Sequence, residues 1–208
     1  MQPVIATTAQ ALDRARGLAQ SATRTLIGIT GAPGAGKSTL AQAVVDHVGE
    51  SARVVSMDGF HLSQRRLREL GRLQRKGAID TFDAAGFVAL VQRLSQPGGE
   101  TVYAPEFRRD LEEPIAGSIA VEPEVRLVVL EGNYLLASYH PWSSLSTVLK
   151  EVWYCERDED QRLRDLITRH ETFGKSSADA RAWALGSDQR NAELIRTTRD
   201  QADLVIAL

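Results

Sequence analysis

One stretch of eight residues constrains the fold of this chain more than any other feature. Residues 31–38 read Gly-Ala-Pro-Gly-Ala-Gly-Lys-Ser and satisfy the pattern G-x-x-x-x-G-K-[ST]. A short apolar run, residues 25–30, comes directly before this stretch, and apolar residues at helical spacing follow it over residues 40–48. The sequence therefore predicts a glycine-rich turn that connects a buried strand to the start of a helix.

A turn of this kind binds phosphate groups. Its glycines let the backbone curl so that successive N–H groups point at phosphate oxygens, and the helix dipole adds positive potential. We expect Lys37 to meet the β- and γ-phosphates, Ser38 to bind Mg²⁺ and Thr39 to bond the α-phosphate. The predicted nucleotide-binding residues are Gly31, Gly34, Ala35, Gly36, Lys37, Ser38 and Thr39. The spacing differs from the G-x-G-x-x-G of dinucleotide sites, which favours a nucleoside triphosphate over NAD.

Apolar runs and helical patterns alternate along the chain. Strands are expected at residues 25–30, 53–57, 126–130, 148–155 and 204–208. Helices are expected at residues 7–22, 40–48, 63–76, around 87–94, and between 157 and 202. Residues 103–123 fit neither pattern and read mostly as loop. The alternation predicts an α/β fold with a mainly parallel five-stranded sheet and helices on both faces.

Composition and charge exclude several classes of protein. A chain of 208 residues with 43% hydrophobic and 25% charged residues suits one globular domain, residues 1–208. The formal net charge of −2 gives no electrostatic case for binding nucleic acid or an anionic membrane. The chain shows neither a membrane-spanning apolar run nor a leader pattern, and its single cysteine is Cys155, so we expect a cytoplasmic protein without membrane insertion.

Two carboxylates follow predicted strands, at the edge where open α/β sheets bind ligands. Asp58 would act there as the general base that accepts the proton of an acceptor hydroxyl, and a capping role is its alternative. Glu131 would face Mg²⁺ or the acceptor, and a solvated strand-end carboxylate is its alternative. Phe60 and His61 would shape an acceptor pocket, although a lone histidine is more often a plain hydrogen-bonded side chain.

Two basic segments carry further hypotheses. Arg162 and Arg169 lie seven residues apart, on one face of a predicted helix, and would neutralise charge on a transferring phosphoryl group. The alternative is a solvated face paired with neighbouring acidic residues. The cluster from Arg65 to Lys76 would attract an anionic substrate, form an exposed helix face or, less favoured because no aromatic residue interleaves it, bind nucleic acid.

Four segments together resemble the uridine kinase, phosphoribulokinase and bacterial pantothenate kinase group of P-loop kinases, over nearly the whole chain. They are residues 31–39, 57–61, 130–132 and 162–169. Asp58-Gly59-Phe60 is similar to the Asp-Gly-Phe of the pantothenate kinases, in which the Asp is the general base. Residues 81–83 and 103–107 resemble the acceptor-side segments of this group, which implies an acceptor contact for Tyr103. Within the group, the chain looks most like small proteins labelled fructose transport system kinases.

The resemblance implies a P-loop NTPase fold and an ATP- and Mg²⁺-dependent transfer of the γ-phosphoryl group to a hydroxyl of a small metabolite, a sugar or sugar-containing compound. It places an acceptor-side insertion at about residues 59–123 and a lid at about residues 157–176. The implied catalytic residues are Asp58, Lys37, Arg162 and Arg169, and the implied acceptor-binding residues are Asp58, Phe60, His61, Tyr103 and Glu131. A nucleoside or pantothenate kinase, and a nucleotide-hydrolysing switch or regulator, stay open as alternatives, and so does a homodimer.

Overall fold

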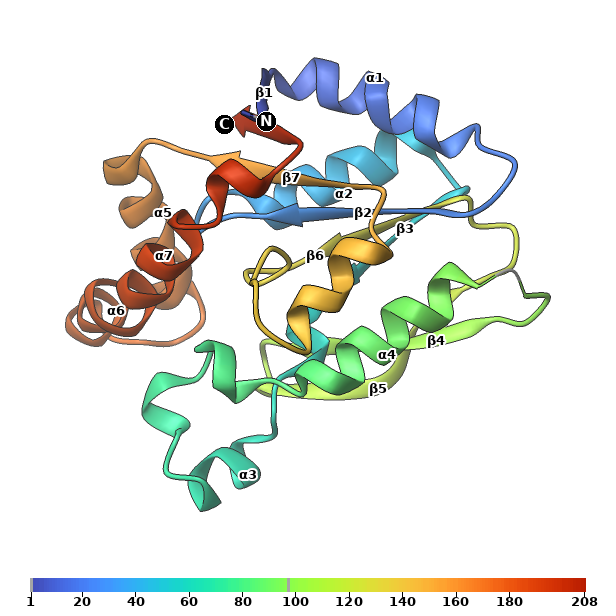
Figure 1. Ribbon diagram of the computed structural model, residues 1–208. Coiled ribbons are helices and arrows are strands. Elements are labelled where there is room, and N and C mark those ends of the chain that lie inside the picture. The colour runs from blue at the N-terminus through green and yellow to red at the C-terminus, as the bar shows by residue number, and fades with distance from the viewer. Residues whose placement is uncertain (1, 97) are drawn as a thin grey trace.

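A computed structural model describes residues 2–96 and 98–208 and contains one large parallel sheet (Figure 1). Six strands lie in the order β1, β8, β7, β2, β6 and β3, and every neighbouring pair is parallel. In chain order these strands are β1 (Val4–Ala6), β2 (Thr25–Thr30), β3 (Ala52–Ser56), β6 (Leu127–Glu131), β7 (Glu151–Glu156) and β8 (Leu204–Ala207). The α/β fold class predicted from the sequence is therefore confirmed.

The sheet has one strand more than the five that the sequence predicts. The additional strand, β1, is three residues long, lies at the edge beside β8, and leaves Val4 and Ile5 exposed. The central strand β2 is different, because Leu26 to Thr30 are all buried between its neighbours. A continuous apolar run marks a strand that is buried on both faces, and a short exposed edge strand lacks that signal.

Helices cover both faces of the sheet. On one face, α1 (Thr8–Ala19) and α2 (Lys37–Val48) pack against Ile27 and Ile29 of β2. On the other face, α4 (Ala84–Ser95) and a 3-10 segment, Trp142–Thr147, pack around Leu26. Alternate residues of one strand thus enter two separate cores, as the period of a strand requires. Among the described residues, no helix is both long and apolar enough to cross a bilayer.

Three helices follow the carboxyl end of β7. They are α5 (Glu159–Thr172), α6 (Ser177–Trp183) and α7 (Gln189–Arg196), with one π-helical segment, Ala184–Asp188, between the last two. Figure 1 shows them gathered at one end of the sheet, where the chain leaves β7. The charged region of residues 157–202 is therefore helical, as the sequence predicts.

The middle of the chain differs from its sequence-based prediction. Residues 103–123 are not loop: β4 (Val102–Arg108) and β5 (Glu113–Val121) form a separate antiparallel hairpin. Pro105 lies in β4 beside a register shift, and much of β5 is exposed, so neither strand shows a continuous apolar pattern. The helix predicted for residues 63–76 is also shorter, because α3 (Gln64–Glu69) ends before Gly71, whose φ is 65°.

Candidate active site

The glycine-rich turn adopts the conformation that the pattern predicts. Gly31, Gly34 and Gly36 have φ values of 147°, 84° and 87°, which residues with a Cβ atom rarely adopt. A Cβ at Gly31 would also lie 2.7 Å from the carbonyl oxygen of Cys155. The turn therefore needs glycine for its backbone path and for its contact with β7. It leads into α2, which begins at Lys37.

Lys37 is buried at the base of a cavity of about 890 Å³. Its Nζ donates a hydrogen bond of 3.1 Å to the carbonyl oxygen of Ala32, inside the same turn. Burial lowers the pKa of the Lys37 ammonium, and the nearby Glu131 carboxylate offsets only part of this lowering. Ser38 and Thr39 line the same cavity. The positive group and the first turn of α2 thus face one space, as phosphate binding requires.

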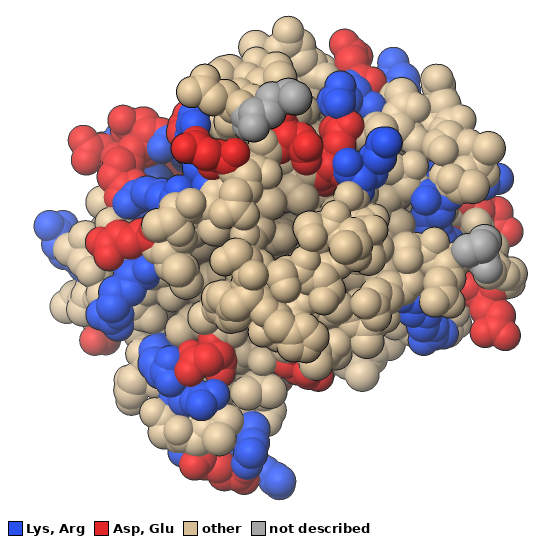
Figure 2. Space-filling view, viewed as in Figure 1, with Lys and Arg blue, Asp and Glu red and all other residues tan. Residues whose placement is uncertain are grey.

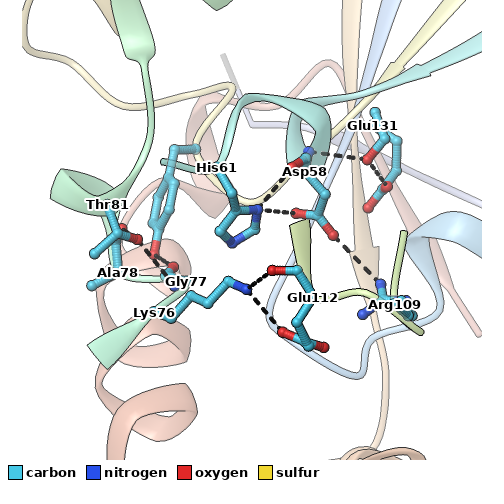
Figure 3. A network of polar contacts seen from close by, with 11 residues as sticks. Asp58, His61, Lys76, Gly77, Ala78, Thr81, Arg109, Glu112 and Glu131 are labelled. Carbon is cyan, nitrogen blue, oxygen red and sulfur yellow. Dashed lines mark hydrogen bonds and ion pairs between the residues drawn. The ribbon is translucent and has the colours of Figure 1, made fainter. Parts of the chain in front are cut away.

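Asp58 follows β3 in a short 3-10 turn, Met57–Phe60, and its side chain is 29% exposed to the cavity. Ser56 Oγ accepts a 3.2 Å hydrogen bond from the Asp58 backbone N–H and so fixes the turn. One carboxylate oxygen lies 3.4 Å from Arg109 and the other 3.9 Å from His61 (Figure 3). Burial raises the pKa of this carboxyl, but His61, Arg109 and Lys37 outweigh burial and lower it overall. Asp58 is therefore an ionised group that can accept a proton.

Glu131 lies beside Asp58 at the end of the neighbouring strand. In the register of β3 and β6 it faces Ser56, whose Oγ donates a 3.0 Å hydrogen bond to its carboxylate. Burial raises the pKa of Glu131, and the Lys37 ammonium offsets only part of this rise. The Ser38 hydroxyl and the Glu131 carboxylate are hard oxygen donors that suit Mg²⁺. No cluster of three or more His, Cys, Asp or Glu side chains that could hold a metal occurs in the described residues, so phosphate and water oxygens would complete such a site.

The two arginines predicted on one helix face have different surroundings. Arg169 lines the cavity and is close enough to Asp188, Asp58 and Glu131 for their charges to act on it. Arg162 does not line the cavity, because its side chain is only 2% exposed. Its guanidinium donates hydrogen bonds to the carbonyl oxygen of Pro33, to Glu159 and to Gln189. Of the two arginines expected to close over the site, Arg169 therefore lines the cavity, whereas Arg162 stands outside it and holds the phosphate-binding turn through Pro33.

The structure brings His61 into the cavity but not Phe60 or Tyr103. His61 lies between the rings of Phe82 and Phe107, with centroids 4.1 and 4.9 Å away, and burial lowers the pKa of its imidazole. Phe60 packs edge-on against Phe87 in the core. Tyr103 is 59% exposed on β4 and lies outside the cavity. In this structure Phe60 therefore packs behind the cavity wall and Tyr103 faces outward.

Arg109 and Asp188 line the cavity, although no sequence pattern predicts either of them. Arg109 lies in the turn between β4 and β5, and its guanidinium also stands 5.7 Å from the ring of Phe173 at the end of α5. His170 contacts Asp188 at 2.7 Å. The turn of a hairpin and a side chain on the π-helical segment meet the site only through tertiary folding. Two adjacent arginines, Arg108 and Arg109, do not by themselves indicate a binding site in the sequence.

Most arginines of the basic cluster from Arg65 to Lys76 pair with nearby carboxylates. Arg65 and Arg66 pair with Glu69, and Arg72 and Arg75 pair with Asp80. Figure 2 shows blue and red side chains intermixed on the lobe that carries α3, while the central part of the same face is uncharged. Lys76 is the exception, because it lines the cavity and donates two hydrogen bonds to Glu112 (Figure 3). Most of this cluster therefore forms an exposed face, which is one of the alternatives that the sequence left open.

Comparison with known proteins places this site in a family, although no protein-family model matches the chain. An ATP-dependent kinase-like protein of Aspergillus versicolor is 35% identical over 152 residues, which cover 69% of this chain and 88% of that protein. A protein of Schizosaccharomyces pombe named "putative uridine kinase" is 39% identical over 140 residues; the match covers 63% of this chain and 60% of that protein's length. The crystal structure of a "putative fructose transport system kinase" from Silicibacter sp. TM1040 is 36% identical, with a TM-score of 0.85 over 96% of this chain and 98% of that one.

Proposed function

This chain belongs to the uridine kinase group of P-loop kinases, and we propose that it transfers the γ-phosphoryl group of ATP to a hydroxyl of a sugar or sugar-containing metabolite. One observation carries the proposal: Asp58 and Lys37 face the same cavity from different strand ends. A phosphate-binding turn alone serves hydrolysis as well as transfer. A carboxylate opposite the turn, in a cavity with room for a second molecule, favours transfer to an acceptor.

In the proposed reaction, Asp58 accepts the proton of the acceptor hydroxyl. The acceptor oxygen forms a bond to the γ-phosphorus as the bond from that phosphorus to the β–γ bridging oxygen breaks, and ADP leaves with the bridging oxygen. Asp58 then releases the proton to water. Lys37 and the backbone N–H groups of residues 34–38 hold the phosphates in line with the acceptor.

Ser38 and Glu131 are the residues that would hold Mg²⁺. The chemistry that the ion would supply there is to offset the negative charge of the phosphate groups. Glu131 is buried beside the acidic Asp58, so a divalent cation would also stabilise two neighbouring carboxylates. Arg169 would stabilise charge on the transferring group from the lid segment, residues 157–176, and closure of that segment would exclude water as a competing acceptor.

A sugar acceptor is supported by the bacterial structure at 36% identity, whose name refers to fructose transport. A nucleoside is the second candidate acceptor. It is supported by the name of the Schizosaccharomyces relative and by the phenylalanine rings, Phe82 and Phe107, that line the cavity and could contact a base. A fructose-like sugar and a uridine-like nucleoside are therefore the two acceptor skeletons to test first.

The test is ADP formation from ATP and Mg²⁺ across acceptors that include fructose, uridine, pantothenate and ribulose 5-phosphate. We expect one acceptor to stimulate ADP formation, and we expect Asp58→Asn to abolish that stimulation. Asp46→Asn, an exposed aspartate on α2, is the matched control and should behave like the natural chain. ADP formation that no acceptor stimulates would contradict the proposal and favour a nucleotide-hydrolysing switch.

A further inference from the structure

Arg109 binds its carboxylate partner less completely than three other arginines of this chain do. Arg14, Arg108 and Arg199 each donate two hydrogen bonds to one carboxylate, at distances from 2.6 to 3.1 Å. Arg109 makes a single contact of 3.4 Å with Asp58, and within the described residues it makes no other hydrogen bond. A guanidinium carries five N–H donors in a fork that fits a carboxylate or phosphate. Most donors of Arg109 are therefore open to a ligand.

The cavity around Arg109 contains a further cation without an acidic partner. Lys175 stands 4.7 Å from the ring of Trp183, and no carboxylate pairs with it in the described part of the chain. The carboxylates nearby are already bound, because Glu112 accepts from Lys76 and Asp188 contacts His170. This end of the cavity therefore offers positive charge that the protein itself does not neutralise.

The hairpin turn that carries Arg109 is held in place over the cavity. Lys76 donates to the backbone oxygen of Glu112 at 2.6 Å and to its carboxylate at 2.9 Å, and the backbone N–H of Gln64 donates to Glu113 at 3.0 Å. The same guanidinium of Arg109 stands over Phe173, two residues before Lys175. Figure 3 shows Arg109 and Glu112 on the same side of Asp58. Arg109 thus lies where the acceptor side meets the lid segment.

We propose that the acceptor carries an anionic group, a carboxylate or a phosphate monoester, which Arg109 binds through two N–H donors, and that this binding draws Arg109 away from Asp58. The inference rests on the proposed function, and it names the substrate class of that same site. Arg109 occupies one of the two oxygens of Asp58 until such an acceptor arrives. Water does not carry the anionic group, so it would not release Asp58 in this way.

The experiment uses pairs of acceptors that share a carbon skeleton and differ in charge. Glycerol and glycerate test a carboxylate, while fructose with fructose 6-phosphate and ribose with ribose 5-phosphate test a phosphate monoester. ADP formation and phosphorylated product are measured with the natural chain, with Arg109→Gln and with Arg108→Gln. Arg108 is the matched control, because it is the adjacent residue, lies outside the cavity and pairs with Asp110.

We expect the anionic member of at least one pair to be the better acceptor. For that acceptor, Arg109→Gln should lower kcat/KM by roughly 10- to 100-fold, the loss expected when a charge-assisted ion pair is removed. For the neutral member the same variant should lower kcat/KM by a clearly smaller factor, because that acceptor lacks the group that Arg109 binds, and Arg108→Gln should change either value by less than about twofold. Circular dichroism of both variants checks that the hairpin still folds.

Two results would overturn the inference, and they separate it from the proposed function. If the neutral members are phosphorylated as well as the anionic ones, in a reaction that Asp58→Asn removes, the function stands and the anionic substrate class is wrong. The same conclusion follows if Arg109→Gln lowers kcat/KM equally for both members of a pair. If no acceptor of any pair stimulates ADP formation, the proposed function is wrong and this inference falls with it.

Discussion

The nucleotide side and the acceptor side of the cavity are built in different ways. On the nucleotide side, charged side chains bind backbone carbonyl groups: Lys37 donates to Ala32 and Arg162 donates to Pro33. On the acceptor side, the charged contacts join side chains from distant segments. Arg109 lies 51 residues from its partner Asp58, and Lys76 lies 36 residues from Glu112.

This difference separates a fixed half of the site from an adjustable half. A backbone carbonyl inside a tight turn cannot move without refolding the turn, so the phosphate-binding groups are in place before ligand arrives. A 3.4 Å contact between two side chains is loose, and a ligand can replace it. We therefore expect substitutions on the nucleotide side to change stability and rate broadly, and those on the acceptor side to change substrate preference.

The largest effect on stability is expected at Arg162. Arg162→Ala removes a buried guanidinium and leaves the Pro33 carbonyl and Gln189 without their donor, so the free energy of unfolding should fall by about 2–3 kcal/mol. Urea unfolding of the variant measures the change. Arg164→Ala, an exposed arginine on the same helix, is the matched control and should stay within about 0.5 kcal/mol. A loss below about 1 kcal/mol at Arg162 would place it outside the fixed half.

Arg169 should affect rate rather than stability. Arg169→Gln removes a cation that faces Asp58 and Glu131, and it should lower kcat by roughly 10²- to 10³-fold, the effect of losing one electrostatic stabiliser. Steady-state kinetics with Arg164→Gln as control measures this. Unchanged kcat would show that Arg169 does not stabilise the transferring phosphoryl group.

The ion pair between Arg162 and Glu159 should make the stability of the protein depend on pH. Arg162, and to a smaller extent Arg196, donate hydrogen bonds to the Glu159 carboxylate. These bonds outweigh the effect of burial and lower the pKa of Glu159 from 4.5 to about 2. Because the folded pKa lies below the unfolded one, the stabilisation is complete above about pH 4.5 and is lost as the pH falls toward about 2. Glu159 is partly exposed, so Glu159→Gln should cost less than about 1 kcal/mol at pH 7. Urea titrations from pH 7 to pH 3 should show this difference shrinking, and a constant difference would contradict the pair.

Tyr103 should have the smallest effect. Its side chain is exposed on the outer side of the hairpin, away from the cavity, so Tyr103→Ser should change kcat/KM for the acceptor by less than about twofold. Kinetics with the identified acceptor measures this. A tenfold loss would mean that the hairpin rotates when the acceptor binds, so that Tyr103 contacts the acceptor during the reaction.

Local patterns explain which parts of the fold and the site were predictable. The turn at residues 31–38, the strands β2 and β6 and the start of the helix α1 depend on neighbouring residues, and the structure has them where the sequence predicts them. The hairpin of β4 and β5 depends on pairing between exposed strands, and Pro105 interrupts its pattern. The sequence could not show this, because cross-strand partners decide such a hairpin.

The site divides along the same line. Asp58 and Glu131 each follow a buried strand, so the parallel sheet alone brings them to one edge. Arg162 and Arg169 do share a helix, but the side chains packed around α5 decide which of them reaches the cavity. Arg109 reaches Asp58 only because the hairpin folds back over the sheet edge. Contacts of that kind have no signature in sequence spacing.

The most direct test of the account is phosphoryl transfer by Asp58→Asn with the identified acceptor at saturating ATP. We predict that phosphorylated acceptor forms more slowly by a factor on the order of 10² to 10⁴, while the Kd for ATP changes by less than about threefold. Lys37→Ala, in contrast, should weaken both ATP binding and transfer. Equal rates of transfer in Asp58→Asn and the natural chain would remove Asp58 as the base and contradict the central claim that this cavity joins a fixed phosphate site to an acceptor-activating carboxylate.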